Sequence, residues 1–192
     1  MIRTYLSRLP GIFIGALFAL ASSVSLAAVE DQAANGFTVT ETAAIGAPAD
    51  RVFQAVIVPS RWWNSEHTYS QNAANLALDA RAGGCWCETL PGGGSVQHLM
   101  VVNVIPGKLL RLRGALGPLQ GMGVDGALTV SLRGSGNATQ LTLTYAVGGY
   151  SRPGFGELAK AVDSVLADQT ARLKRFIETG SPESALHPKE GQ

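Results

Sequence analysis

The sequence predicts an α+β fold in which an antiparallel sheet curves around one long C-terminal helix. Apolar residues recur every three or four positions across residues 155–177, which is typical of an amphipathic helix. Several segments before that helix alternate apolar and polar residues, as half-buried strands do. The connections between these segments are of hairpin length, so neighbouring strands should be antiparallel. Strands and helices occupy separate parts of the chain, which favours the α+β class.

The C-terminal helix is the strongest element of the prediction. Its apolar stripe comprises Leu158, Val162, Val165, Leu166, Leu173, Phe176 and Ile177. Gly180 and Pro182 follow the stripe and are residues that commonly end a helix. Gln169 falls near the middle of the stripe, so we expect its side chain to face the sheet.

Composition suits one domain with an extended N-terminal segment. The chain has 192 residues, of which 46% are hydrophobic and 15% charged. Its net charge of +1 gives no reason to expect a nucleic-acid partner. Residues 1–27 resemble an export signal, with Arg3 and Arg8 before an apolar run and Ser25-Leu26-Ala27 as the cleavage site. Cleavage after Ala27 would take the net charge to about −1.

The alternative is that this segment stays attached as a membrane anchor, because residues 11–28 are almost long enough to span a bilayer. In both cases the folded domain should lie outside the cytoplasm, in the periplasm or secreted. A membrane is a partner only if the signal is not cleaved.

Four parts follow in chain order: the signal at 1–27, a linker at 28–36, the folded domain at 37–179 and a disordered tail at 180–192. A first strand at 37–45 is followed by a short helix that opens at Pro48-Ala49-Asp50. A second short helical turn should cover residues 60–63. The remaining strands are predicted at 76–78, 85–89, 95–105, 109–113, 128–132 and 141–147, so the sheet should have about six to seven strands.

Several stretches resemble a known superfamily. They are residues 48–53 after the first strand, Arg61-Trp62-Trp63, Gly83-Gly84 before Trp86, residues 106–110 and residues 112–119. Their order is similar to that in the SRPBCC superfamily, which includes START, birch-pollen-allergen and polyketide-cyclase proteins. The resemblance covers about residues 37–179 and implies a helix-grip fold with an internal cavity for an apolar or amphipathic ligand. It implies no single reaction, because the superfamily contains carriers, cyclases and co-chaperones.

Strand pairing predicts which side chains line that cavity. Leu110 and Leu112 alternate with arginines and should face inward, and a two-residue turn at 106–107 would set them opposite Asn103 and Val101. Extending the same register gives the inner face as Trp86, Glu88, Gln97, Leu99, Val101, Asn103, Leu110 and Leu112. The other candidate ligand contacts are Trp62, Trp63, Met122, Tyr145, Val165 and Gln169. The tryptophans could instead pack the core or a lid, and Met122 could belong to an ordinary loop.

Glu88 is the one acidic residue placed inside the sheet. Burial among apolar groups would raise its pKa and could make it a general acid or base. No partner beside it is fixed by the sequence, so an anchoring hydrogen bond to a ligand is the other interpretation. His67, in a loop after Trp63, is a second weak catalytic candidate.

Cys85 and Cys87 leave the same face of their strand, and the register sets His98 opposite Cys87 and Met100 opposite Cys85. Two thiols, an imidazole and a thioether would suit copper or zinc. A disulfide between the two cysteines looks unfavourable, because strand neighbours two apart are separated by about 6.5–7 Å. Free thiols and an intermolecular disulfide are the alternatives.

The sequence therefore predicts an exported protein that binds a small hydrophobic or amphipathic molecule, with no cofactor. A cyclase- or hydrolase-like enzyme that uses the same cavity is the second hypothesis. A soft-metal or thiol module at Cys85 and Cys87 is the third.

Overall fold

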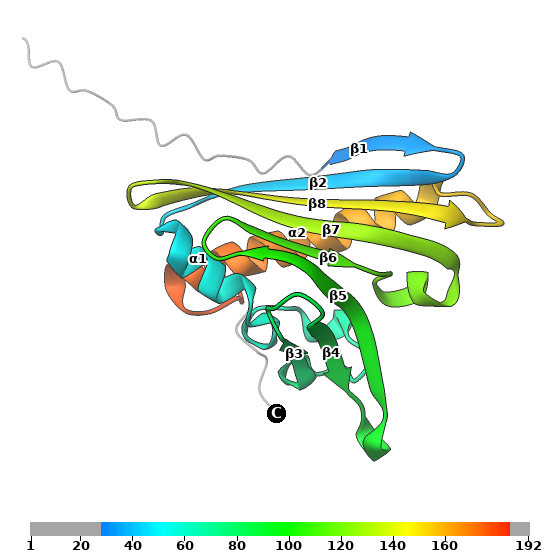
Figure 1. The fold of residues 1–192 in the computed structure, drawn as a ribbon, viewed down its shortest axis with the longest axis horizontal. Coiled ribbons are helices and arrows are strands. Elements are labelled where there is room, and N and C mark those ends of the chain that lie inside the picture. The colour runs from blue at the N-terminus through cyan, green and yellow to red at the C-terminus, as the bar shows by residue number, and fades with distance from the viewer. Residues whose placement is uncertain (1–27, 185–192) are drawn as a thin grey trace, which may run out of the picture.

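A computed structural model describes residues 28–184, so the predicted signal at 1–27 and residues 185–192 lie outside the described part. Eight antiparallel strands form one open sheet, and a long helix lies across one of its faces (Figure 1). The strands are β1 (Ala28–Ala33), β2 (Gly36–Ile45), β3 (Leu76–Leu78), β4 (Cys85–Thr89), β5 (Ser95–Ile105), β6 (Leu109–Arg113), β7 (Gly123–Ser135) and β8 (Ala138–Tyr150). Their order across the sheet is β1-β2-β8-β7-β6-β5-β4-β3. The α-helices are α1 (Ala49–Val56) and α2 (Gly156–Thr179).

The sheet and the long helix agree with the predicted α+β class. The sheet has eight strands and not six to seven, because it gains an edge strand that was not predicted. Residues 28–33 form β1, which pairs with β2, where a linker was expected. The second short helix is only a 3₁₀ turn, Pro59–Arg61. Further 3₁₀ turns cover Ser65–His67, Ala73–Asn75, Pro91–Gly93 and Gly117–Gly121.

The helix α2 packs its apolar stripe against the sheet. Leu166, Leu173 and Ile177 are buried in the same core as Val39 of β2. Gly180 ends the helix in the left-handed conformation, with its N–H bonded to the carbonyl of Phe176. The next residues return to the helix, because Glu183 accepts two hydrogen bonds from the Arg172 guanidinium, at 2.7 and 3.1 Å. The described start of the predicted disordered tail is therefore attached to α2.

Two β-bulges in β5 correct the predicted pairing. Trp86 pairs with Leu99 but Cys87 pairs with Gln97, which leaves His98 as an extra residue in β5. The second register shift lies between Val101 and Asn103. A one-residue shift moves the following side chains to the other face of the sheet.

Three placements change as a result. Gln97 and Asn103 are exposed, where the regular register placed them inside. His98 is buried, where that register placed it outside and opposite Cys87. Leu110 pairs with Val104 and not with Asn103, whereas Leu112 pairs with Val101 as expected.

Within residues 28–184, no helix is long and apolar enough to cross a membrane.

Candidate ligand-binding site

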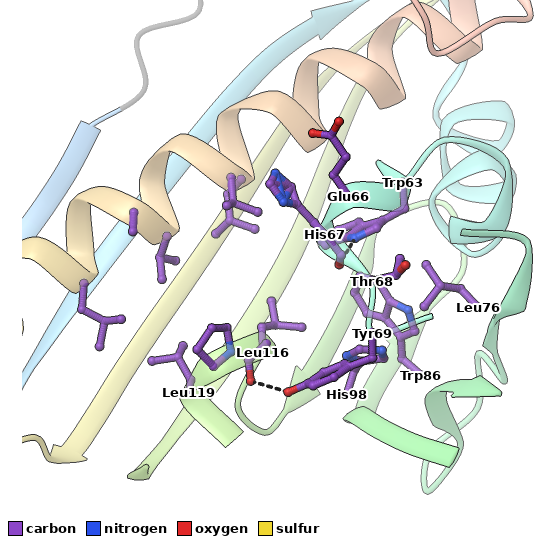
Figure 2. A pocket seen from close by; sticks show the side chains of 17 residues that line it. Trp63, Glu66, His67, Thr68, Tyr69, Leu76, Trp86, His98, Leu116 and Leu119 are labelled. Carbon is purple, nitrogen blue, oxygen red and sulfur yellow. Dashed lines mark hydrogen bonds between the residues drawn. The ribbon is translucent and has the colours of Figure 1, made fainter. Parts of the chain in front are cut away.

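A cavity of about 440 Å³ lies between α2, the segment that precedes β3 and the strands β4 and β5 (Figure 2). Its helical side consists of the apolar side chains Leu158, Ala161, Val162, Val165 and Leu166. These residues lie in the N-terminal half of α2, and all but Ala161 belong to its apolar stripe. Residues 116–119, around the 3₁₀ turn Gly117–Gly121, form another side of the cavity.

Aromatic residues form the side opposite α2. Trp63 and Trp86 line the cavity and meet edge to face, with ring centroids 4.9 Å apart. The Trp63 indole N–H donates to the carbonyl of His67 at 3.0 Å, which holds the segment 63–67 as a compact loop. Tyr69 donates from its hydroxyl to the carbonyl of Gly117 at 2.9 Å and so joins two loops of the cavity wall (Figure 2).

Tyr145 of β8 holds the loop that leads to residues 116–119. Its buried hydroxyl donates to the carbonyl of Gly114 at 3.0 Å and accepts the N–H of Leu116 at 3.1 Å. Burial raises the pKa of Tyr145 to about 12, so the phenol stays protonated and can donate. Gly126 lets the ring approach, because a Cβ there would stand 2.6 Å from the ring edge.

Replacing Tyr145 with phenylalanine is expected to destabilise the protein by about 1–3 kcal/mol, because two backbone groups lose their partner. Urea denaturation measures this change. Tyr150→Phe is the matched control, since Tyr150 lies in the same strand and is 71% exposed. Equal stabilities of the two variants would contradict the role of the Tyr145 hydroxyl.

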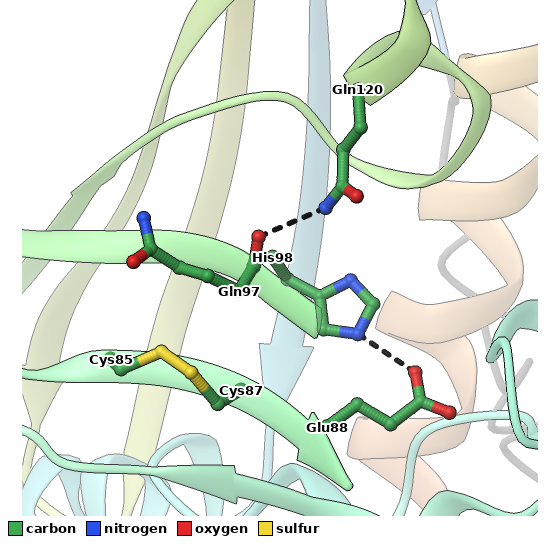
Figure 3. The surroundings of a disulfide bond; sticks show 6 residues. All are labelled: Cys85, Cys87, Glu88, Gln97, His98 and Gln120. Atoms are coloured by element: carbon green, nitrogen blue, oxygen red, sulfur yellow. Dashed lines mark hydrogen bonds and ion pairs between the residues drawn. A yellow bond between two sulfur atoms is a disulfide. The ribbon is translucent and has the colours of Figure 1, made fainter. Parts of the chain in front are cut away.

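A buried imidazole–carboxylate pair stands at one end of the cavity. His98 lines the cavity, and its Nε2 lies 2.9 Å from Glu88 Oε2 (Figure 3). Glu88 also accepts the backbone N–H of Tyr69 at 3.1 Å and that of Ser70 at 2.5 Å. These contacts connect the loop before β3 with β4 and β5.

The pKa of Glu88 lies below its ordinary value, not above it as the sequence suggested. Burial alone would raise this pKa, but hydrogen bonds from Ser70, Tyr69 and His98 stabilise the carboxylate and outweigh burial. Glu88 is therefore a carboxylate that positions other groups, and it is unsuited to act as a general acid near neutral pH.

The cavity includes some of the predicted site residues and excludes others. Trp63, Trp86, Val165 and His67 line it. Several candidates are buried but are not part of its lining: Trp62, Glu88, Leu99, Val101, Leu110, Leu112 and Tyr145. Met122 is half-buried against the core and also lies outside the lining. Their roles as ligand contacts stay predictions.

Gln169 has a structural contact that the sequence did not suggest. Its Oε1 accepts the backbone N–H of Asn64 at 2.8 Å, and the side chain is fully buried. It therefore ties α2 to the loop after Trp63, and it is not part of the cavity wall.

The two cysteines form a disulfide with each other, which corrects the expectation of free thiols or a metal site. Their Cα atoms are 5.4 Å apart, closer than in a regular extended strand, so the bond fits (Figure 3). Met100 does pair with Cys85, but His98 is turned to the inner face with Glu88. Among residues 28–184 no three His, Cys, Asp or Glu side chains are grouped to hold a metal.

A pair of carboxyl groups lies under α2. Glu41 of β2 is fully buried, and neither of its carboxyl oxygens has a hydrogen-bond partner among the described residues. Burial, together with the nearby Asp163 of α2, raises the pKa of Glu41 to about 7. Neither residue lines the cavity.

Comparison with known proteins shows the fold class and no family. No protein-family model and no curated protein sequence matches this chain. Solved structures do match. A conserved protein of unknown function from Enterococcus faecalis, EF2215, has a TM-score of 0.55 at 15% identity, over 88% of this chain and 83% of that one.

Two other solved structures are similar to this chain, and they are two different kinds of protein. DynU16, from the dynemicin biosynthetic locus, has a TM-score of 0.51 at 25% identity; the match covers 76% of this chain and 48% of DynU16. The Aha1 dimer from Colwellia psychrerythraea has a TM-score of 0.50 at 16% identity, over 74% of this chain and 97% of that one. The open antiparallel sheet with a long C-terminal helix is consistent with a helix-grip fold. This fold is found in proteins of differing function, so the site must carry the functional argument.

Proposed function

We propose that this protein binds a small hydrophobic or amphipathic molecule non-covalently inside the cavity under α2. The observation that carries the proposal is the cavity itself, whose volume of about 440 Å³ lies in the range of small-molecule sites. Its walls are mainly aliphatic and aromatic, with a few polar groups at the end that contains His98. Such a surface suits a ligand with an apolar body and one polar group.

We further propose that the protein acts outside the cytoplasm. The Cys85–Cys87 disulfide supports this, because disulfides persist in oxidising compartments. The basic and apolar pattern of residues 1–27 supports it independently.

Filling the cavity tests the binding function. Val165→Trp places an indole among the apolar side chains of α2 that line the cavity and is expected to weaken binding of the neutral dye Nile red at least tenfold. Fluorescence titration measures the affinity, and native mass spectrometry of the purified wild-type protein should show a retained apolar adduct.

Lys160→Trp is the control for this experiment. It adds the same indole to the exposed face of the same helix and should leave Nile red binding unchanged. Equal binding by the two variants, or no binding of the dye to the wild-type protein, would contradict a ligand site in this cavity.

A cyclase- or hydrolase-like enzyme is the second candidate, and the His98–Glu88 pair favours it, because an imidazole oriented by a carboxylate can accept a proton. Incubation of a candidate substrate with wild-type protein and with Glu88→Gln, His98→Phe and His67→Ala variants tests this alternative. Turnover that survives in all three variants would exclude these residues as catalytic groups.

A further inference from the structure

The polar end of the cavity has a defined hydrogen-bonding character. Glu88 accepts two backbone N–H groups and faces Nε2 of His98 at 2.9 Å. A carboxylate can only accept hydrogen bonds, so the proton of a neutral His98 ring belongs on Nε2. The remaining nitrogen, Nδ1, then carries a lone pair, and the hydrogen bond seen for this ring within residues 28–184 is the one through Nε2.

The imidazole is also held in place by its neighbours. Its ring centroid lies 5.9 Å from that of Tyr69 and 6.3 Å from that of Trp86. Tyr69 is in turn fixed at both ends, by its N–H to Glu88 and by its hydroxyl to Gly117. An acceptor held in this way loses little conformational freedom when a ligand binds.

The charge of the cavity wall limits the kind of ligand. The lining contains no lysine or arginine among the described residues, and Glu66 contributes a carboxyl group at the wall. A bound carboxylate or phosphate would therefore meet no lysine or arginine in this lining, whereas a neutral hydroxyl can donate to the lone pair of His98.

We propose that His98 Nδ1 accepts a hydrogen bond from a hydroxyl group of the ligand, so that the site selects neutral apolar alcohols, phenols or enols. This inference rests on the proposed binding function, and it names the class of ligand. Glu88 acts as a positioning residue, because it fixes the position of the proton on His98 without contacting the ligand.

Three probes with the same polycyclic body test the inference. They are 1-hydroxypyrene, 1-methoxypyrene and 1-pyrenecarboxylate, titrated by fluorescence at pH 7.5 into the full-length protein. The wild-type protein is expected to bind the hydroxyl compound about five- to tenfold more tightly than its methyl ether, as one hydrogen bond allows. The carboxylate should bind more weakly than either.

Variants of His98 and Glu88 then identify the group that accepts the hydrogen bond from the ligand hydroxyl. In His98→Phe the ratio of the hydroxyl to the methoxy affinity should fall to about one, while the methyl ether still binds. Glu88→Gln removes the charge that fixes the proton on Nε2, so the ratio should fall there too with the imidazole still present. A purely structural role of Glu88 would weaken all three probes together. His98→Leu, which also lacks an acceptor, serves if the phenylalanine variant does not fold.

The outcomes separate the two proposals. Equal wild-type affinities for the hydroxyl and methoxy probes would overturn the hydroxyl selection and leave the binding function intact. A preference that persists in His98→Phe or His98→Leu would overturn the role of His98. Failure of all three probes to bind the wild-type protein would instead count against the binding function.

Discussion

At pH 8, Glu41→Gln is expected to be more stable than the wild-type protein by about 2–3 kcal/mol, and at pH 4.5 this gain should disappear. Glu41 is fully buried beside Asp163, and its pKa is raised to about 7 by burial and by that neighbour. A raised pKa in the folded state means that the protonated form is favoured by folding. The stability it contributes is complete below about pH 4.5, the value for the unfolded chain, and is lost as the pH rises through about 7.

Urea denaturation from pH 4.5 to pH 8 measures this dependence. Glutamine keeps the shape of the protonated side chain and cannot ionise, so the variant should show a flatter profile than the wild-type protein. Glu157→Gln is the control, because Glu157 lies on the same helix as Asp163 and its side chain is 91% exposed. A wild-type profile parallel to that of Glu41→Gln would show that Glu41 does not titrate in this range.

Glu88→Ala is expected to lower the free energy of unfolding by about 3 kcal/mol at pH 7. The substitution leaves two backbone N–H groups, of Tyr69 and Ser70, and the His98 ring without their acceptor. For a domain of this size the melting temperature should fall by roughly 6–12 °C. Calorimetry or thermal circular dichroism measures the shift.

Glu66→Ala is the matched control, since Glu66 precedes Tyr69 and Ser70 in the segment that Glu88 holds, but it is exposed. Its effect on stability should stay within about 0.5 kcal/mol. The pKa of Glu88 is lowered, so its contribution should be present above about pH 4.5 and be lost as the pH falls below that value. A Glu88→Ala protein as stable as Glu66→Ala at pH 7 would contradict the anchoring role.

The fold could be predicted from the sequence because its signals are periodic and local. Alternation in residues 37–45, 128–132 and 141–147 identified β2, β7 and β8, and the apolar stripe identified α2. The strand β1 was missed, since Ala28–Ala33 is mostly small and polar and its pairing with β2 is set by tertiary contacts.

The candidate site could be predicted only in part. Alternation placed Trp86 and Glu88 on the inner face, and both are buried. The predicted positions of His98, Gln97 and Asn103 were wrong. Each bulge in β5 adds one residue, and no local sequence pattern indicates where a bulge occurs. The partner of Glu88 was therefore missing from the prediction. The disulfide was missed for a related reason, since ideal strand spacing overestimated the separation of Cys85 and Cys87.

The extra residue in β5 also suggests how this pocket could have gained its chemistry. A strand without His98 would pair regularly with β4 across Trp86 and Cys87, and the cavity would have no imidazole at that end. One extra residue in β5 therefore brings an imidazole to the cavity, while β5 keeps β4 and β6 as its partners. The length of one strand thus decides which side chain reaches this end of the cavity, and the order of strands in the sheet does not depend on it.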